Sequence, residues 1–125
     1  MKPDLANQTS EDRRLVTDVV YQASRALGLT NQELADVLGL SRRSVERMKG
    51  GRFQLDPAKK EWELALYIIR LFRSLDAICA GDEEVVRQWM RNPNDDLADA
   101  PKARIRSIEG LISTLQYVDS SRAVA

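Results

Sequence analysis

The sequence predicts an all-α fold with three parts: a helical bundle first, then a long central helix, then a small C-terminal helical subdomain. The 125 residues contain no Asn-Gly hairpin signal and no alternating run of β-branched residues. Apolar residues recur at intervals of three and four, and helix-capping residues precede several of these runs. The expected division is a flexible tail, the bundle, the connecting or dimerisation helix and the subdomain, at residues 1–8, 9–56, 57–81 and 82–125.

Composition limits the classes of function. The 19 basic residues balance the 19 acidic ones, so binding of nucleic acid must come from a local patch. There is no histidine and one cysteine, Cys79, which excludes Ser-His-Asp and Cys-His catalytic arrangements and the usual metal ligands. We therefore expect no enzyme, no metal site and no cofactor. Cys79 itself is expected to be a small buried hydrophobe.

Signals for export or membrane insertion are not visible. The longest apolar run, 64-LALYII-69, is far shorter than the ~20 residues of a membrane-spanning helix. The N-terminal residues have no apolar core of the kind that signal peptides carry. We expect a soluble, cytoplasmic protein without membrane contact.

The first predicted helix lies between two clear boundary signals. Thr9 and Ser10 can cap its start, and Gly28 ends it. Its apolar positions run at helical spacing from Leu15 to Leu27.

Two short helices follow. Thr30 begins the first of them with Glu33 three residues later, which is the pattern of a capping box. Gly39 ends this helix after about two turns. Ser41 then caps the next helix, and the pair 50-GG-51 stops it.

The central helix is predicted from Asp56, a capping residue, and Pro57, which suits the first helical position. No glycine or proline intervenes before Ala80, so the helix has about 24 residues, or about 36 Å. Apolar residues mark two sides of it, with Trp62, Leu66, Ile69 and Phe72 on one and Leu64, Ile68, Leu71, Leu75 and Ile78 on the other. Both sides need cover, either from two packing units of one chain or from two subunits.

The last third is predicted as two helices joined by the stretch 89-WMRNPNDDLADAP-101. Asp82 can cap the first of these helices, 83–90. Apolar anchors at Trp89, Leu97 and Ile105 indicate that the stretch is a loop folded against the central helix. The second helix lies beyond Pro101 and ends near Asp119, followed by a terminal tail.

Four residues have the spacing of a helix-turn-helix: Ala35, Gly39, Val45 and Met48. This motif needs a small residue where two helices cross, a glycine in the turn and two apolar residues that anchor the second helix. On these residues the segment from Ser10 to Phe53 resembles the Xre/Cro helix-turn-helix family.

The second helix of this motif carries a local excess of positive charge. Between residues 41 and 52 there are five basic residues and one acidic residue, a net +4 in a neutral chain. Arginine reads guanine in the major groove, while lysine and serine suit phosphates. The alternative is a solvated basic face that never meets DNA. The predicted DNA-contacting residues are Ser41, Arg42, Arg43, Ser44, Glu46, Arg47, Lys49 and Arg52, and useful affinity requires a homodimer.

The C-terminal residues form a second pattern, which consists of Trp89-Met90, Asn92-Pro93-Asn94, Leu97, Pro101 and Gly110, followed by a helix. Their order is similar to that of the toxin-binding domain of the MbcA/ParS/Xre antitoxins. The resemblance implies a type II toxin-antitoxin system, an autoregulated operator and a partner toxin of the RES-domain type, which consumes NAD.

The resemblance also implies that the antitoxin's last residues block the toxin's active site, with a helix from Ser107 to Val118 presenting them. In this chain the blocking segment would be Asp119, Ser120, Ser121, Arg122, Ala123, Val124 and Ala125. Arg122 could occupy a site built for phosphate groups. Alternatively, the segment is an ordinary frayed end without function.

The chain departs from the family pattern in two places. Ala98 stands where a glycine is common after the loop leucine, and Ser121 and Arg122 stand in place of a Gly-Val near the end. Gly110 is kept although glycine inside a helix costs about 1 kcal/mol, which indicates a close approach of backbones there. A stand-alone Xre-family repressor with a C-terminal dimerisation domain, sensing a small ligand, is the alternative function.

Overall fold

The computed structural model describes residues 5–124, with the side chains of residues 10–122. The described chain is all-α, as predicted. Its helices are α1 (Leu5–Ala26), α2 (Asn31–Leu38), α3 (Arg42–Met48), α4 (Lys60–Ile78), α5 (Glu83–Arg91), the 3₁₀ turn η1 (Asp95–Leu97), α6 (Pro101–Arg104) and α7 (Ile108–Val124).

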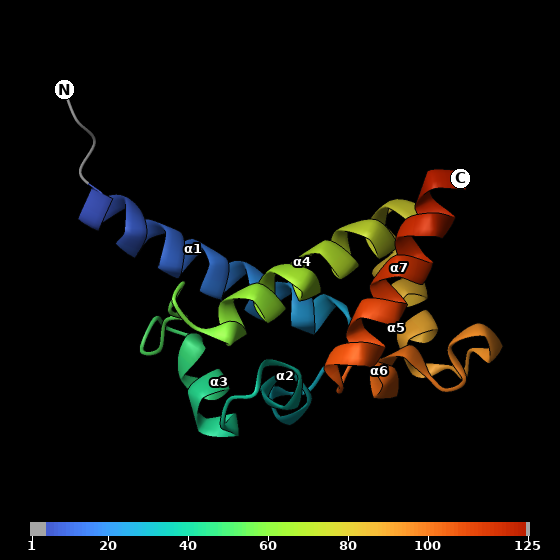
Figure 1. The fold of residues 1–125 in the computed structure, drawn as a ribbon, viewed down its shortest axis with the longest axis horizontal. Coiled ribbons are helices and arrows are strands. Elements are labelled where there is room, and N and C mark those ends of the chain that lie inside the picture. The colour runs from blue at the N-terminus through green and yellow to red at the C-terminus, as the bar shows by residue number, and fades with distance from the viewer. Residues whose placement is uncertain (1–4, 125) are drawn as a thin grey trace.

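The central helix α4 organises the fold. It packs against α1 on one side and α7 on the other, and α2 also contacts it. Figure 1 shows α1 crossing α4, with α2 and α3 below the crossing and α5, α6 and α7 gathered at one end. Intramolecular cover therefore accounts for most of the two-sided apolar pattern of α4.

One hydrophobic core runs through both halves of the protein. Ile68 and Leu71 of α4 are fully buried in the same cluster of buried residues as Leu34 of α2 and Leu111 of α7. This shared burial stabilises the packing of the two halves against each other, by about 25 cal/mol per Å² of apolar area removed from water. Cys79 packs against the edge of this core but is only half-buried, whereas the sequence predicted a buried side chain.

Two helix starts differ from the prediction. Helix α1 begins at Leu5, so Thr9 and Ser10 lie inside it and not at its start. Helix α4 begins at Lys60 because the Asp56 side chain accepts the Ala58 N–H at 2.9 Å. That hydrogen bond makes a turn around Pro57, and the helix starts only after the turn.

The long C-terminal helix was predicted as one piece and is divided in the structure. Helix α6 ends at Arg104, and α7 begins at Ile108 after a tight turn. Ser107 causes the new start, because its Oγ accepts the Gly110 N–H at 3.0 Å as an N-cap does. Helix α7 then continues to Val124, well beyond the predicted end near Asp119.

None of the helices in the described part of the chain is long and apolar enough to cross a lipid bilayer.

Candidate functional site

The turn between α2 and α3 has the geometry of a helix-turn-helix. Gly39 has a φ of +73°, and its N–H donates to the carbonyl of Ala35. The Leu40 N–H donates to the same carbonyl at 3.0 Å. Ala35, Val45 and Met48 are all buried, so the four predicted anchor residues do join the two helices.

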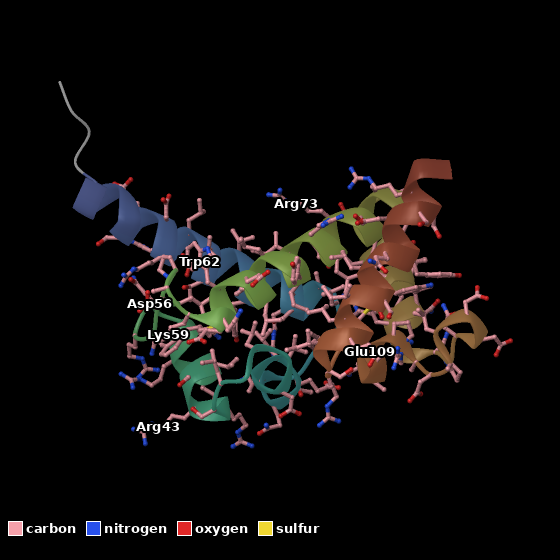
Figure 2. The ribbon with its side chains drawn as sticks, in the orientation of Figure 1. Arg43, Asp56, Lys59, Trp62, Arg73 and Glu109 are labelled. Carbon is pink, nitrogen blue, oxygen red and sulfur yellow. The ribbon has the colours of Figure 1, made fainter. Side chains whose placement is uncertain are left out.

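Basic side chains project from α3 and from the turn that follows it. Exposed residues of this kind are Arg42, Arg43, Arg47, Lys49 and Arg52. Arg43 points away from the body of the protein in Figure 2. Arg42 pairs with Glu46 at 3.0 Å, but an exposed helix pair contributes only about 0.3–0.5 kcal/mol. A phosphate group could therefore replace the Glu46 carboxylate easily.

The two predicted serines are engaged with each other at the start of α3. Ser41 accepts the Ser44 N–H at 3.1 Å, and its hydroxyl donates to the Ser44 hydroxyl at 3.0 Å. At the other end of α3, the Arg47 carbonyl accepts the N–H groups of Arg52 and Phe53, both at 3.0 Å. All eight predicted DNA-contacting residues therefore come from one short helix, its N-cap and the turn closed onto its end.

The stretch between α5 and α6 is a folded loop, as predicted. The Asn94 side chain accepts the N–H groups of Asp96 and Leu97, and the Asn94 N–H donates to the Asp99 carbonyl at 3.2 Å. Leu97 is buried. Ala98 has a φ of +66°, in the left-handed region that favours glycine. A glycine at this position would adopt the same conformation without a Cβ clash, which is the physical reason why the position suits glycine.

This loop is joined to α7. Trp89 stacks on Tyr117, with ring centroids 6.4 Å apart and 14° between the ring planes. The Tyr117 hydroxyl donates to Asp96 at 2.9 Å, and that hydrogen bond to a carboxylate raises the pKa of Tyr117. The prediction placed Trp89 against the central helix, but its aromatic partner lies on α7.

The C-terminal segment is helical and is attached to α4. Asp119 forms an ion pair with Arg70 and accepts the hydroxyl of the buried Ser74 at 2.9 Å. Arg122 donates to the same hydroxyl at 3.4 Å. The side chains of Ala123 and Val124, and all of Ala125, lie outside the described residues. The sequence predicted that the helix ends near Asp119 and that a terminal tail follows. Helix α7 continues to Val124, so the predicted helix end was wrong.

Comparison with protein families places two models end to end on this chain. Residues 9–70 match the antitoxin Xre-like helix-turn-helix domain, and residues 74–123 match the antitoxin Xre/MbcA/ParS C-terminal toxin-binding domain. Among curated proteins no sequence matches the chain.

The chain carries the two domains of an Xre-type antitoxin. The pair supports a role as the antitoxin of a toxin-antitoxin system. The predicted DNA-contacting residues fall in the helix-turn-helix domain, and Asp119 to Ala123 fall in the toxin-binding domain. The boundary between the matches lies within α4, at residues 71–73, so this helix contributes to both domains.

Ion pairs between the two antitoxin domains were not predicted. Lys102 of α6 pairs with Glu33 at 2.9 Å and donates to the Gly28 carbonyl at 3.0 Å, while Arg106 pairs with Asp36 at 2.6 Å. Both acidic partners lie on α2, the helix that precedes α3. No local signal could have revealed these pairs. The capping box alone explains a glutamate at position 33, so the sequence gives no indication that Glu33 also has a distant partner.

The environment of Glu33 shifts its acidity. Partial burial raises the pKa of Glu33, but hydrogen bonds from Thr30 and Lys102 lower it, and the result is a pKa below the usual value. Both the capping box and the ion pair to Lys102 therefore favour the ionised carboxylate.

Proposed function

We propose that this chain is a type II antitoxin that neutralises a RES-domain, NAD-degrading toxin and binds its own operator DNA. In this proposal the C-terminal turns of α7 dock at the entrance of the toxin's active site. Helix α3 enters the major groove, where Arg42, Arg43 and Arg47 reach base edges or phosphates. Neither activity requires a cofactor or a catalytic group in the antitoxin.

The observation that carries the proposal is the order of the two matched domains along one chain, residues 9–70 and then 74–123. The geometry adds support for the inhibitory end. Ser120, Ser121 and Arg122 are exposed on the last turns of α7, while Asp119 holds those turns to α4. An inhibitory segment held in a helix before binding loses less conformational entropy when it docks.

Co-expression tests the toxin-directed part of the proposal. We expect a neighbouring gene to encode a RES-domain protein; that protein should arrest growth alone, and the full chain should restore growth. Deletion of residues 120–125 should abolish rescue while it leaves operator binding intact, because Asp119 remains to hold α7. Rescue by the shortened chain would contradict inhibition by the C-terminal turns.

The paired substitution Arg42→Ala and Arg43→Ala tests the DNA-directed part. We expect operator affinity to fall, by about 1–3 kcal/mol for each bidentate arginine–base pair that the substitutions remove, while growth rescue persists. Fluorescence anisotropy with operator DNA measures the affinity. Unchanged binding would mean that another face of the domain reads DNA.

We also propose that the antitoxin is a homodimer, since one helix-turn-helix reads only a half-site. Leu15 of α1 and Leu66 of α4 keep 60% and 43% of their surfaces exposed and support self-association. Light scattering of the purified antitoxin measures its mass directly. A monomer at micromolar concentration would contradict the proposed dimer.

A stand-alone repressor is the second candidate function. The attachment of Asp119 to Arg70 and Ser74 favours it, because it gives the C-terminal segment a structural role that needs no toxin. In that case the shortened chain and the full chain would behave alike in every toxin assay, and neither would bind the RES-domain protein.

A further inference from the structure

A groove lies between the first half of α4 and the first half of α7, on the side of α4 that faces α7. Its volume is about 410 Å³, and its lining is mostly apolar. The lining residues are Lys60, Glu63, Leu64, Tyr67, Ile108 and Ile112.

Ile108 is the most exposed apolar member of this lining. It keeps 67% of its surface exposed, the largest value among the large apolar side chains that the structure describes. Its position is fixed by the backbone, because Gly110 presses the first turn of α7 against the Arg104 carbonyl. Leu111, three residues later, is buried in the core. The burial of Leu111 and the contact at Gly110 together set the orientation of α7, and in that orientation Ile108 is exposed.

Single exposed apolar residues are ordinary, but one beside an apolar groove is characteristic of an interface. The charged residues at the rim of the groove indicate which charge a partner would carry. The Tyr67 hydroxyl donates to the Glu63 carboxylate at 3.0 Å. Lys60 has no carboxylate within ion-pair distance among the described residues. A matching surface would offer an apolar side chain to the groove and a carboxylate to Lys60.

We infer that this groove is a second docking site for the toxin, one that takes an apolar side chain flanked by an acidic residue. The inference rests on the proposed function. The α7 wall of the groove lies inside the matched toxin-binding domain, residues 74–123. The same helix continues to Arg122, 14 residues beyond Ile108, which is about 21 Å at 1.5 Å rise per residue. One toxin domain can cover both ends of a helix of that length.

The substitution Ile108→Glu in the full-length chain tests the inference. The probe is a purified, catalytically inactive variant of the RES-domain protein that we expect a neighbouring gene to encode, titrated by calorimetry. We expect the affinity to fall about thirtyfold, as for a central interface residue. Lys60→Glu should weaken binding as well. Val85→Glu is the matched control, since Val85 is 43% exposed on α5 outside the groove, and its toxin affinity should equal that of the unmodified chain.

Three outcomes separate the groove from the proposed function. If the unmodified chain and Ile108→Glu bind the toxin equally, the groove is not a docking site although the antitoxin role stands. If Ile108→Glu halves the mass of the free chain and leaves toxin affinity unchanged, the occupant is a second copy and the inference is wrong. If the unmodified chain does not bind the RES-domain protein, the proposed function fails and the docking site fails with it. Circular dichroism confirms that each variant remains folded.

Discussion

Replacement of Gly110 by alanine is the sharpest single test of this fold. A Cβ atom at Gly110 would lie 2.7 Å from the Arg104 carbonyl carbon and 2.9 Å from Ser107 Oγ, and closer still to the Arg104 oxygen. Ordinary van der Waals contact begins near 3.4 Å, so the carbonyl carbon alone demands a shift of 3.4 − 2.7 = 0.7 Å. The Arg104 atoms belong to the backbone, so no side-chain rotation relieves the clash.

The shift separates α6 from α7, and the buried residues Ile105 and Leu111 flank the contact. Overpacking of a dense core costs about 1–3 kcal/mol and occasionally more, and a backbone clash belongs at the upper end. The better helix propensity of alanine returns about 1 kcal/mol. We expect Gly110→Ala to lower the free energy of unfolding by about 2 kcal/mol and Tm by about 8 °C.

Chemical denaturation and calorimetry measure both quantities. Gln116→Ala, an exposed position on the same helix, is the control and should change stability by less than about 0.5 kcal/mol. The sign of the change in stability shows whether the backbones approach closely at Gly110, because alanine in place of an unstrained helical glycine stabilises a protein by about 0.4–1 kcal/mol. A variant as stable as the unmodified chain would refute the close approach.

Three further predictions concern single residues. Ala98→Gly should raise the free energy of unfolding by up to about 1 kcal/mol, because it removes left-handed strain at a φ of +66°. A lower Tm would contradict this prediction. The control is Ala77→Gly, within α4, which should lower the free energy of unfolding by about 1 kcal/mol. The folded-state pKa of Glu33 is lowered, so its stabilising contribution is present above its ordinary pKa of 4.5 and is lost as pH falls through the folded-state value. Acid titration monitored by circular dichroism should therefore show Glu33→Gln less sensitive to acid than the unmodified chain, and Lys102→Met should reduce the sensitivity partly. Ser74→Ala should speed amide hydrogen exchange in the last turns of α7 without change in α2, and exchange in α7 equal to that of the unmodified chain would show that the serine does not hold this helix.

Local chemistry explains which parts of the fold the sequence could predict. The capping box of Thr30 and Glu33, the cap at Ser41 and the left-handed glycine at residue 39 are confirmed as predicted. Each depends on residues within four positions of one another, so a short window of sequence contains the whole interaction. The amphipathic pattern similarly identified Val45 and Met48 as buried.

Predictions failed where two local signals competed. Asp56 suits both a helix cap and a turn, and the hydrogen bond to Ala58 selected the turn. Ile105, at the break between α6 and α7, continues the apolar period, so periodicity alone predicted one helix. Ser107 caps a new helix start there, and Gly110, which has no Cβ, permits the close contact with the Arg104 carbonyl at the break.

The sequence by itself determined the all-α class, the helix-turn-helix and the family resemblance of both halves, because these reside in spacing and in residue type. Only the tertiary structure decided how the halves are joined. Lys102 reaches Glu33, a residue of the other domain, and Asp119 reaches Arg70 across 49 positions of sequence. Such contacts depend on where α4 places α2 and α7, which no local pattern encodes. The exposure of Ile108 is also decided by tertiary structure, because it is the packing of α7 against the rest of the fold that leaves this side chain in solvent.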